Sequence, residues 1–171
     1  MDALLNRLRE EIEESTEGLA DVDWSRAPQG RWNSAQILEH LGRSYGTTAK
    51  MLELCMETGN APQIRAAKIR ELLVKLLIVN LGVFPSGAKS PVQVLPQGDS
   101  GPEALRRALS NLERMDIAIA KAELCWGNDK PIAMHPILGP LNPAQWRKFH
   151  YLHGHHHVRQ MRERVGRKAA G

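Results

Sequence analysis

Five of the seven histidines lie within eight consecutive residues near the C-terminal end, in the stretch HYLHGHHH from His150 to His157. Each residue of a helix turns by about 100°, so His153 and His157 fall on one face together with apolar side chains, while His155 falls on the opposite face. An i, i+4 pair places two imidazoles one above the other, which lets both bind a single metal ion. The spacing therefore predicts two inward-facing metal ligands.

A third histidine, His40, lies at the edge of the apolar stripe of another predicted helix. Burying three imidazoles costs free energy unless each finds a partner, and a shared cation would satisfy all three together. For one histidine alone, a hydrogen bond to the backbone or to Tyr45 is the simpler explanation. For the cluster we favour a divalent metal site made of His40, His153 and His157.

Three neutral imidazoles leave at least one coordination position for water or substrate, so such a site is open and suited to catalysis. All-imidazole ligation indicates zinc or nickel first, with iron, copper and manganese as further candidates. His156 lies at the edge of the inward-facing arc and is expected to contact a neighbouring helix, and His155 is expected to face solvent. Neither is expected to bind the metal.

The elements that must position these histidines are helices, because apolar residues recur at helical spacing along most of the chain. Asn33 or Ser34 can cap the second helix, and Asn142 followed by Pro143 can begin the last one. No strand pattern is evident. The predicted helices run from near the N-terminus to the region of Gly18, from residue 33 to 59, from 66 to 81, from 101 to about 127, and from 143 to about 167.

The helix predicted over 66–81 is joined to the next one by a stretch rich in glycine and proline, VFPSGAKSPVQVLPQGDSGP. Four long amphipathic helices with an additional helix in a long crossover describe an all-α four-helix bundle. A chain of 171 residues is long enough for one domain and too short for two comfortable ones. We therefore expect a single domain over residues 1–171.

Composition excludes several classes of protein. Apolar residues make up 42% and charged residues 25% of the chain, as in ordinary globular proteins. The most apolar run, Leu72 to Leu81, is about half the roughly 20 residues that span a bilayer. The basic residues after Arg159 have no interleaved aromatic residues for base stacking. We expect no membrane and no nucleic acid as partner.

Cysteine usage and the N-terminus indicate the compartment. Cys55 and Cys125 lie far apart in the sequence, without a CxxC partner, and the acidic N-terminal stretch is wrong for a secretory signal. A reduced, cytoplasmic location is the expectation.

The stretch WNSAQILEHL, from Trp32 to Leu41, resembles the DinB/YfiT-like pattern in which a tryptophan and a small polar residue open the second helix before its metal-binding histidine. HGHHHVRQM, from His153 to Met161, resembles the last-helix motif of the same superfamily. MHPILGPLNPAQWRKFHYLH resembles a branch of uncharacterised function, with a His-Pro, Gly and Trp pattern before the last helix. Arg159 departs from the wider pattern, because many relatives carry glycine there.

This resemblance implies a DinB/YfiT-like four-helix bundle whose metal ligands are His40, His153 and His157. It also implies a metal-dependent transferase that uses a low-molecular-weight thiol and acts on a small-molecule substrate, or less often a hydrolase or isomerase. His135 and His150 are candidates for assisting proton transfer or orienting the substrate. The same two residues could instead cap a loop and pack in the core.

Two alternatives to thiol transfer stay open. Metal-assisted hydrolysis would need a carboxylate or histidine near the bound water, and Glu39, next to His40, points away from it on the helix. A non-enzymatic metal or small-ligand binding protein is the other alternative. In that case the apolar run from Leu72 to Leu81 could form a homodimer interface.

Overall fold

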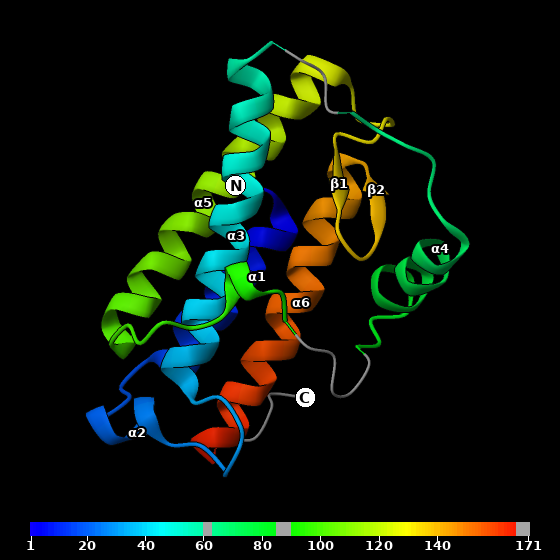
Figure 1. The fold of residues 1–171 in the computed structure, drawn as a ribbon. Coiled ribbons are helices and arrows are strands. Elements are labelled where there is room, and N and C mark those ends of the chain that lie inside the picture. The colour runs from blue at the N-terminus through cyan, green and yellow to red at the C-terminus, as the bar shows by residue number, and fades with distance from the viewer. Residues whose placement is uncertain (60–62, 85–89, 167–171) are drawn as a thin grey trace.

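The computed structural model describes residues 1–59, 63–84 and 90–166, and helices dominate this part of the chain (Figure 1). The architecture is the predicted all-α four-helix bundle, built from the four long helices α1, α3, α5 and α6. A short helix, α2, precedes α3, and α4 lies in the connection between α3 and α5. The bounds are α1 Ala3–Thr16, α2 Asp21–Ser25, α3 Ser34–Glu57, α4 Ile69–Lys75, α5 Gly101–Trp126 and α6 Pro143–Arg164.

Reciprocal side-chain caps begin the two helices that carry the histidines. The Asn33 side chain accepts a hydrogen bond from the backbone N–H of Gln36, whose side chain accepts one from the backbone N–H of Asn33. Asn142 and Gln145 make the same pair of bonds at the start of α6. Each pair satisfies two backbone donors that a helix otherwise leaves without partners. Both predicted helix starts are confirmed.

Helices α1 and α6 lie side by side and run in the same direction (Figure 1). Asp2, just before α1, lies 3.8 Å from Arg147 near the start of α6, and Glu14 lies 3.4 Å from Arg162 near the other end. Gly154 permits the close approach, because a Cβ built there would lie 2.6 Å from two methyl carbons of Leu8.

Helices α3 and α5 form the second parallel pair. Asn111 donates a hydrogen bond to the Gly42 carbonyl at 2.9 Å, and further along both helices Arg114 pairs with Glu53. A Cβ at Gly42 would lie only 3.1 Å from the Cα of Ala108, so glycine lets the two backbones approach. Because α3 and α5 run in the same direction, the chain between them must return along the length of the bundle. This accounts for the long crossover.

The hydrophobic core lies between the four long helices and extends to the short hairpin before α6. Its members are mostly Leu, Ile and Ala at the helical spacing that the sequence predicts. Tyr45 and Trp146 are the largest fully buried side chains. Other large core residues with no exposed surface include Leu5, Leu8, Ile12, Ile37, Leu38, Leu41, Leu52, Leu112, Met115 and Ile119.

The loop predicted between the last two helices is a small antiparallel hairpin instead, and the prediction of no strand was wrong here. Strands β1, Ala133–His135, and β2, Gly139–Leu141, pair with Met134 opposite Pro140. Both strands have only three residues, and β2 contains glycine and proline, so neither shows an alternating pattern. Sequence periodicity therefore gave no signal for them.

The predicted helix over residues 66–81 begins later, at Ile69, and passes into a π-helical turn over Leu76–Asn80. Ile78 and Val79 are buried, whereas Leu73 is 59% exposed and several neighbouring leucines are similarly open. A 3-10 turn, Val92–Val94, follows in the crossover. No helix within the described ranges is long and apolar enough to span a membrane.

Candidate metal centre

The structure brings His40 of α3 together with His153 and His157 of α6. One ring nitrogen from each lies within 4.8 Å of the other two. The Nε2 atoms of His40 and His153 are 3.2 Å apart. Two imidazole nitrogens bound to one tetrahedral zinc ion at about 2.0–2.1 Å would be about 3.3 Å apart. The donor set and this spacing fit a divalent ion held by three imidazoles.

Hydrogen bonds to the second ring nitrogen orient two of the three rings. His40 Nδ1 donates to the Val94 carbonyl at 2.9 Å, and His157 Nδ1 donates to the side-chain oxygen of Gln160 at 2.9 Å. These acceptors place the proton on Nδ1, since a carbonyl oxygen cannot donate. Nε2 of each ring therefore carries a lone pair, as a metal ligand requires. The Nδ1 atom of His153 is buried and makes no hydrogen bond.

Burial holds all three imidazoles in the neutral form. It lowers the pKa of His157 to about 3, with a further contribution from His40 that outweighs the opposing hydrogen bond to Gln160. It also lowers the pKa of His153 well below its usual value, and that of His40 despite the hydrogen bond to Val94. Because metal ions bind neutral imidazole, the site is ready to coordinate a metal at neutral pH.

Aromatic rings pack around the three histidines. The Trp32 ring centre lies 5.0 Å from that of His40, and the Phe84 ring lies 6.0 Å from His153. Phe149 stacks on His153 at 5.5 Å with the ring planes 8° apart. The surroundings of the cluster are therefore largely apolar, which strengthens electrostatic interactions within it.

The two histidines predicted as proton-transfer candidates, His135 of β1 and His150 of α6, both pack against Trp146 and Phe149. His135 Nδ1 accepts hydrogen bonds from the backbone N–H groups of Ile137 and Leu138, so it caps the hairpin turn. His150 is 1% exposed, and its Nε2 lies 3.1 Å from Thr48 Oγ1. His135 thus caps a loop and His150 packs in the core, which are the alternative roles given for them above. Neither belongs to the three-histidine group. Their role in proton transfer stays a prediction.

The two remaining histidines lie outside the cluster, as the helical spacing predicts. His155 Nδ1 lies 2.7 Å from a carboxylate oxygen of Glu11 on α1, so the half-exposed ring has a protein partner as well as solvent. His156 stacks on Phe84 of the crossover at 5.0 Å and accepts a hydrogen bond from the Gln160 amide. Its neighbour is thus a crossover residue and not the expected helix.

Two sets of contacts near His40 were not predicted from the sequence. Val94 contributes its backbone carbonyl, which no side-chain pattern can indicate. Glu39 points away from His40, as predicted, but its carboxylate accepts backbone N–H groups from the crossover. In the sequence, Glu39 stands next to the apolar residues Ile37 and Leu38, and a glutamate buried there needs a specific hydrogen-bond partner. This was the one indication that the sequence offered.

The fold and the site together define a four-helix bundle in which three histidines converge between two of the long helices. Over 96% of its length the chain is similar to YfiT from Bacillus subtilis, described as a probable metal-dependent hydrolase with an unusual four-helix bundle topology. The TM-score is 0.58, the identity is 15%, and the match covers 85% of that chain. At this identity the likeness establishes the fold.

Residues 88–164 also match a family described as a protein of unknown function (DUF1569). This range includes α5, the hairpin and α6, and hence His153 and His157, but not His40. No curated protein matches the sequence.

Proposed function

We propose that the protein binds one divalent metal ion through Nε2 of His40, His153 and His157 and transfers a low-molecular-weight thiol to a small electrophilic substrate. The observation that carries the metal site is the convergence of the three imidazoles, two of them with Nδ1 already engaged by an oxygen acceptor. Zinc and nickel are the ions that suit these donors best, followed by iron, copper and manganese.

A divalent ion at such a site supplies Lewis acidity, which lowers the pKa of a bound thiol or water. The protein's own residues hold and shield this centre. Val94 and Gln160 fix two of the rings, and the aromatic rings of Trp32 and Phe84 pack beside them. The apolar surroundings favour a substrate with an apolar or aromatic body.

Thiol transfer needs no carboxylate base. The thiolate sulfur forms a bond to an electrophilic carbon of the substrate, the leaving group departs with the bonding electrons, and the thiol proton passes to solvent. Among the described residues, the group that could hold a metal contains three histidines and no carboxylate. The acidic side chain nearest in sequence, Glu39, is occupied by three backbone N–H groups. These features favour the thiol reaction over hydrolysis.

Hydrolysis is the second candidate, and the structural likeness to YfiT favours it. A general base would then have to be a histidine. His156, beside His157 at a ring distance of 5.4 Å, is the nearest one with exposed surface. A protein that only binds a metal or small ligand would use the same three ligands without turnover.

Cobalt substitution separates these functions. If a thiol binds at the metal, addition of glutathione, bacillithiol, mycothiol or coenzyme A to the cobalt protein should produce an intense near-ultraviolet charge-transfer band. A hydrolase should bind a carboxylate or hydroxamate and show no such band. An unchanged spectrum with every thiol would overturn thiol transfer and leave hydrolysis or simple metal binding.

A further inference from the structure

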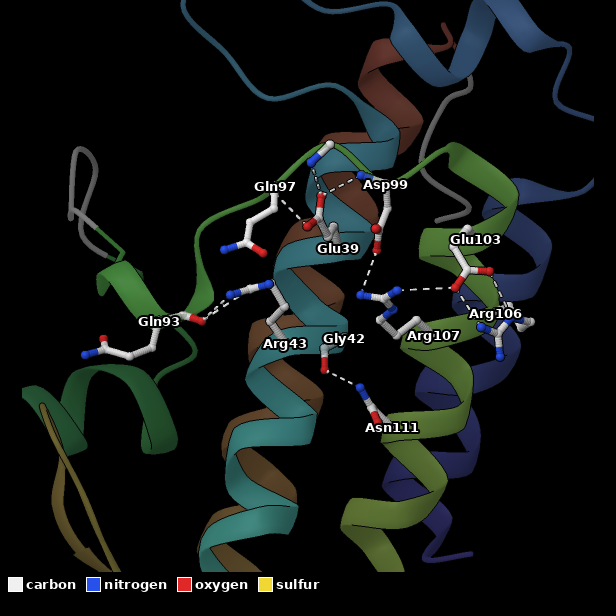
Figure 2. Close-up of polar contacts among 11 residues, drawn as sticks. Glu39, Gly42, Arg43, Gln93, Gln97, Asp99, Glu103, Arg106, Arg107 and Asn111 are labelled. Atoms are coloured by element: carbon white, nitrogen blue, oxygen red, sulfur yellow. Dashed lines mark hydrogen bonds and ion pairs between the residues drawn. The ribbon is translucent and has the colours of Figure 1, made fainter.

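The crossover segment 92–99 lies against α3, where Arg43 and Glu39 bind it at two points (Figure 2). At Gln93, the residue that precedes Val94, the backbone carbonyl accepts hydrogen bonds from Arg43 Nε and Nη2 at 3.2 and 3.1 Å. The next residue, Val94, provides the carbonyl that accepts the hydrogen bond from His40. Among the described residues, this segment therefore supplies the hydrogen-bond partner of His40 Nδ1.

Glu39 binds the C-terminal part of the segment, residues 97–99. Its carboxylate accepts three backbone hydrogen bonds, from Gln97 at 2.6 Å, Gly98 at 2.9 Å and Asp99 at 3.2 Å (Figure 2). The residue is 1% exposed. Burial raises the pKa of the Glu39 carboxyl, whereas these hydrogen bonds and the charge of Arg43 lower it. The lowering is larger, so the pKa lies below its usual value. The group is a buried anion whose partners are all supplied by the crossover and α3.

The same segment is anchored to the neighbouring helix. Asp99 lies 3.2 Å from Arg107 of α5, and Arg107 also contacts Glu103 (Figure 2). A buried donor that loses its acceptor is destabilising, and more so where a charge is involved. The backbone around Val94 is thus fixed by specific charge-assisted bonds, and its glycine- and proline-rich sequence alone would not fix it.

We propose that Glu39 and Arg43 are positioning residues that hold the Val94 carbonyl against His40 and thereby fix the ring orientation and the tautomer of this ligand. A carbonyl displaced by about 1 Å would no longer be within hydrogen-bond distance of Nδ1. His40 could then rotate or carry its proton on Nε2, the atom that points into the histidine cluster. The part of this inference that concerns metal affinity rests on the proposed metal site, whereas the tautomer of His40 does not.

The test compares Glu39→Gln with Glu53→Gln, a matched control. Glu53 is on the same helix and pairs with an arginine of α5, but it does not contact the crossover. The first readout is the imidazole ¹⁵N–¹H spectrum of metal-free protein. We expect the Nδ1–H signal of His40 in the wild type and in the control, and its loss or exchange with the Nε2–H tautomer in Glu39→Gln.

The second readout is zinc affinity, measured by competition with a chromophoric chelator. Loss of an orienting partner weakens metal binding by about 10- to 100-fold. We expect this loss in Glu39→Gln and unchanged affinity in Glu53→Gln. If Glu39→Gln does not fold, Arg43→Met, which frees only the Gln93 side, should show the same changes to a smaller degree.

The two proposals fail in different ways. A wild-type protein that binds no metal overturns the proposed function, and the spectrum of the metal-free protein still tests the positioning role. A Glu39→Gln or Arg43→Met protein that keeps both the Nδ1–H signal and the wild-type zinc affinity overturns the positioning role alone. Equal losses in Glu39→Gln and Glu53→Gln would also overturn it, because a general loss of stability would then explain the effect.

Discussion

His150 is buried among Tyr45, Trp146 and Phe149, and it makes its one side-chain hydrogen bond with Thr48. Burial, with a smaller contribution from His135, lowers the pKa of its imidazole from 6.5 to about 3. The folded protein therefore keeps His150 neutral at a pH where the unfolded chain takes up a proton. Acid then stabilises the unfolded state.

The size of this effect follows from the two pKa values. Above pH 6.5 the ring is neutral in both states and contributes nothing to the pH dependence. As the pH falls below 6.5, the free energy of unfolding decreases, and the decrease levels off near pH 3. At pH 5 the contribution of His150 is a loss of about 2 kcal/mol. This is a large part of the roughly 5–15 kcal/mol that stabilises a typical domain.

The measurement is urea unfolding at pH 7.5 and pH 5.0 with a chelator present, so that metal binding does not contribute. We expect the loss between the two pH values to be about 2 kcal/mol smaller in His150→Gln than in the wild type. Thr48→Val, which removes the hydrogen bond but keeps the imidazole, is the control and should retain the full loss. The same pH-dependent loss in His150→Gln and the wild type would refute the reasoning.

Substitutions at three further positions test the packing, the orientation of a ligand and a helix cap. Gly154→Ala places a Cβ 2.6 Å from Leu8, and the strain should exceed the gain in helix propensity, so thermal unfolding should show a net loss of about 1 kcal/mol. Gln160→Leu removes the acceptor of His157 and should weaken zinc binding about 10- to 100-fold in a chelator competition, whereas Gln160→Glu should retain it. Asn142→Ala should cost about 1 kcal/mol in urea unfolding, and no loss would contradict the cap.

Helical periodicity predicts much of this fold because four long helices each bury one face. The Asn142 cap and the inward positions of His153 and His157 follow from residue type and spacing alone, whereas the structure had to decide between Asn33 and Ser34 as the cap of α3. His40 required a further step, since its position on α3 says nothing about which helix lies opposite. The shared need of three inward-facing imidazoles for a partner suggested that relation, and the motif resemblance supported it.

Features that depend on the path of the crossover could not be predicted in this way. The Val94 carbonyl and His40 form a hydrogen bond although they are 54 residues apart in the sequence. Because the acceptor is a backbone atom, the pattern of side chains cannot indicate it. The strands around His135 are too short to show alternation, and their pairing is visible only in three dimensions. Leu73 and its neighbours have the pattern of a buried face, yet they are exposed, because the helix lies outside the four-helix bundle.

The central claim is that His40, His153 and His157 together bind one divalent metal ion. Elemental analysis of purified, untagged protein after loading with zinc and removal of the excess tests it most directly. We predict one equivalent per chain in the wild type and in His155→Ala, whose ring lies outside the cluster, and none in the triple alanine variant of the three histidines. A full equivalent retained by the triple variant would contradict the assignment.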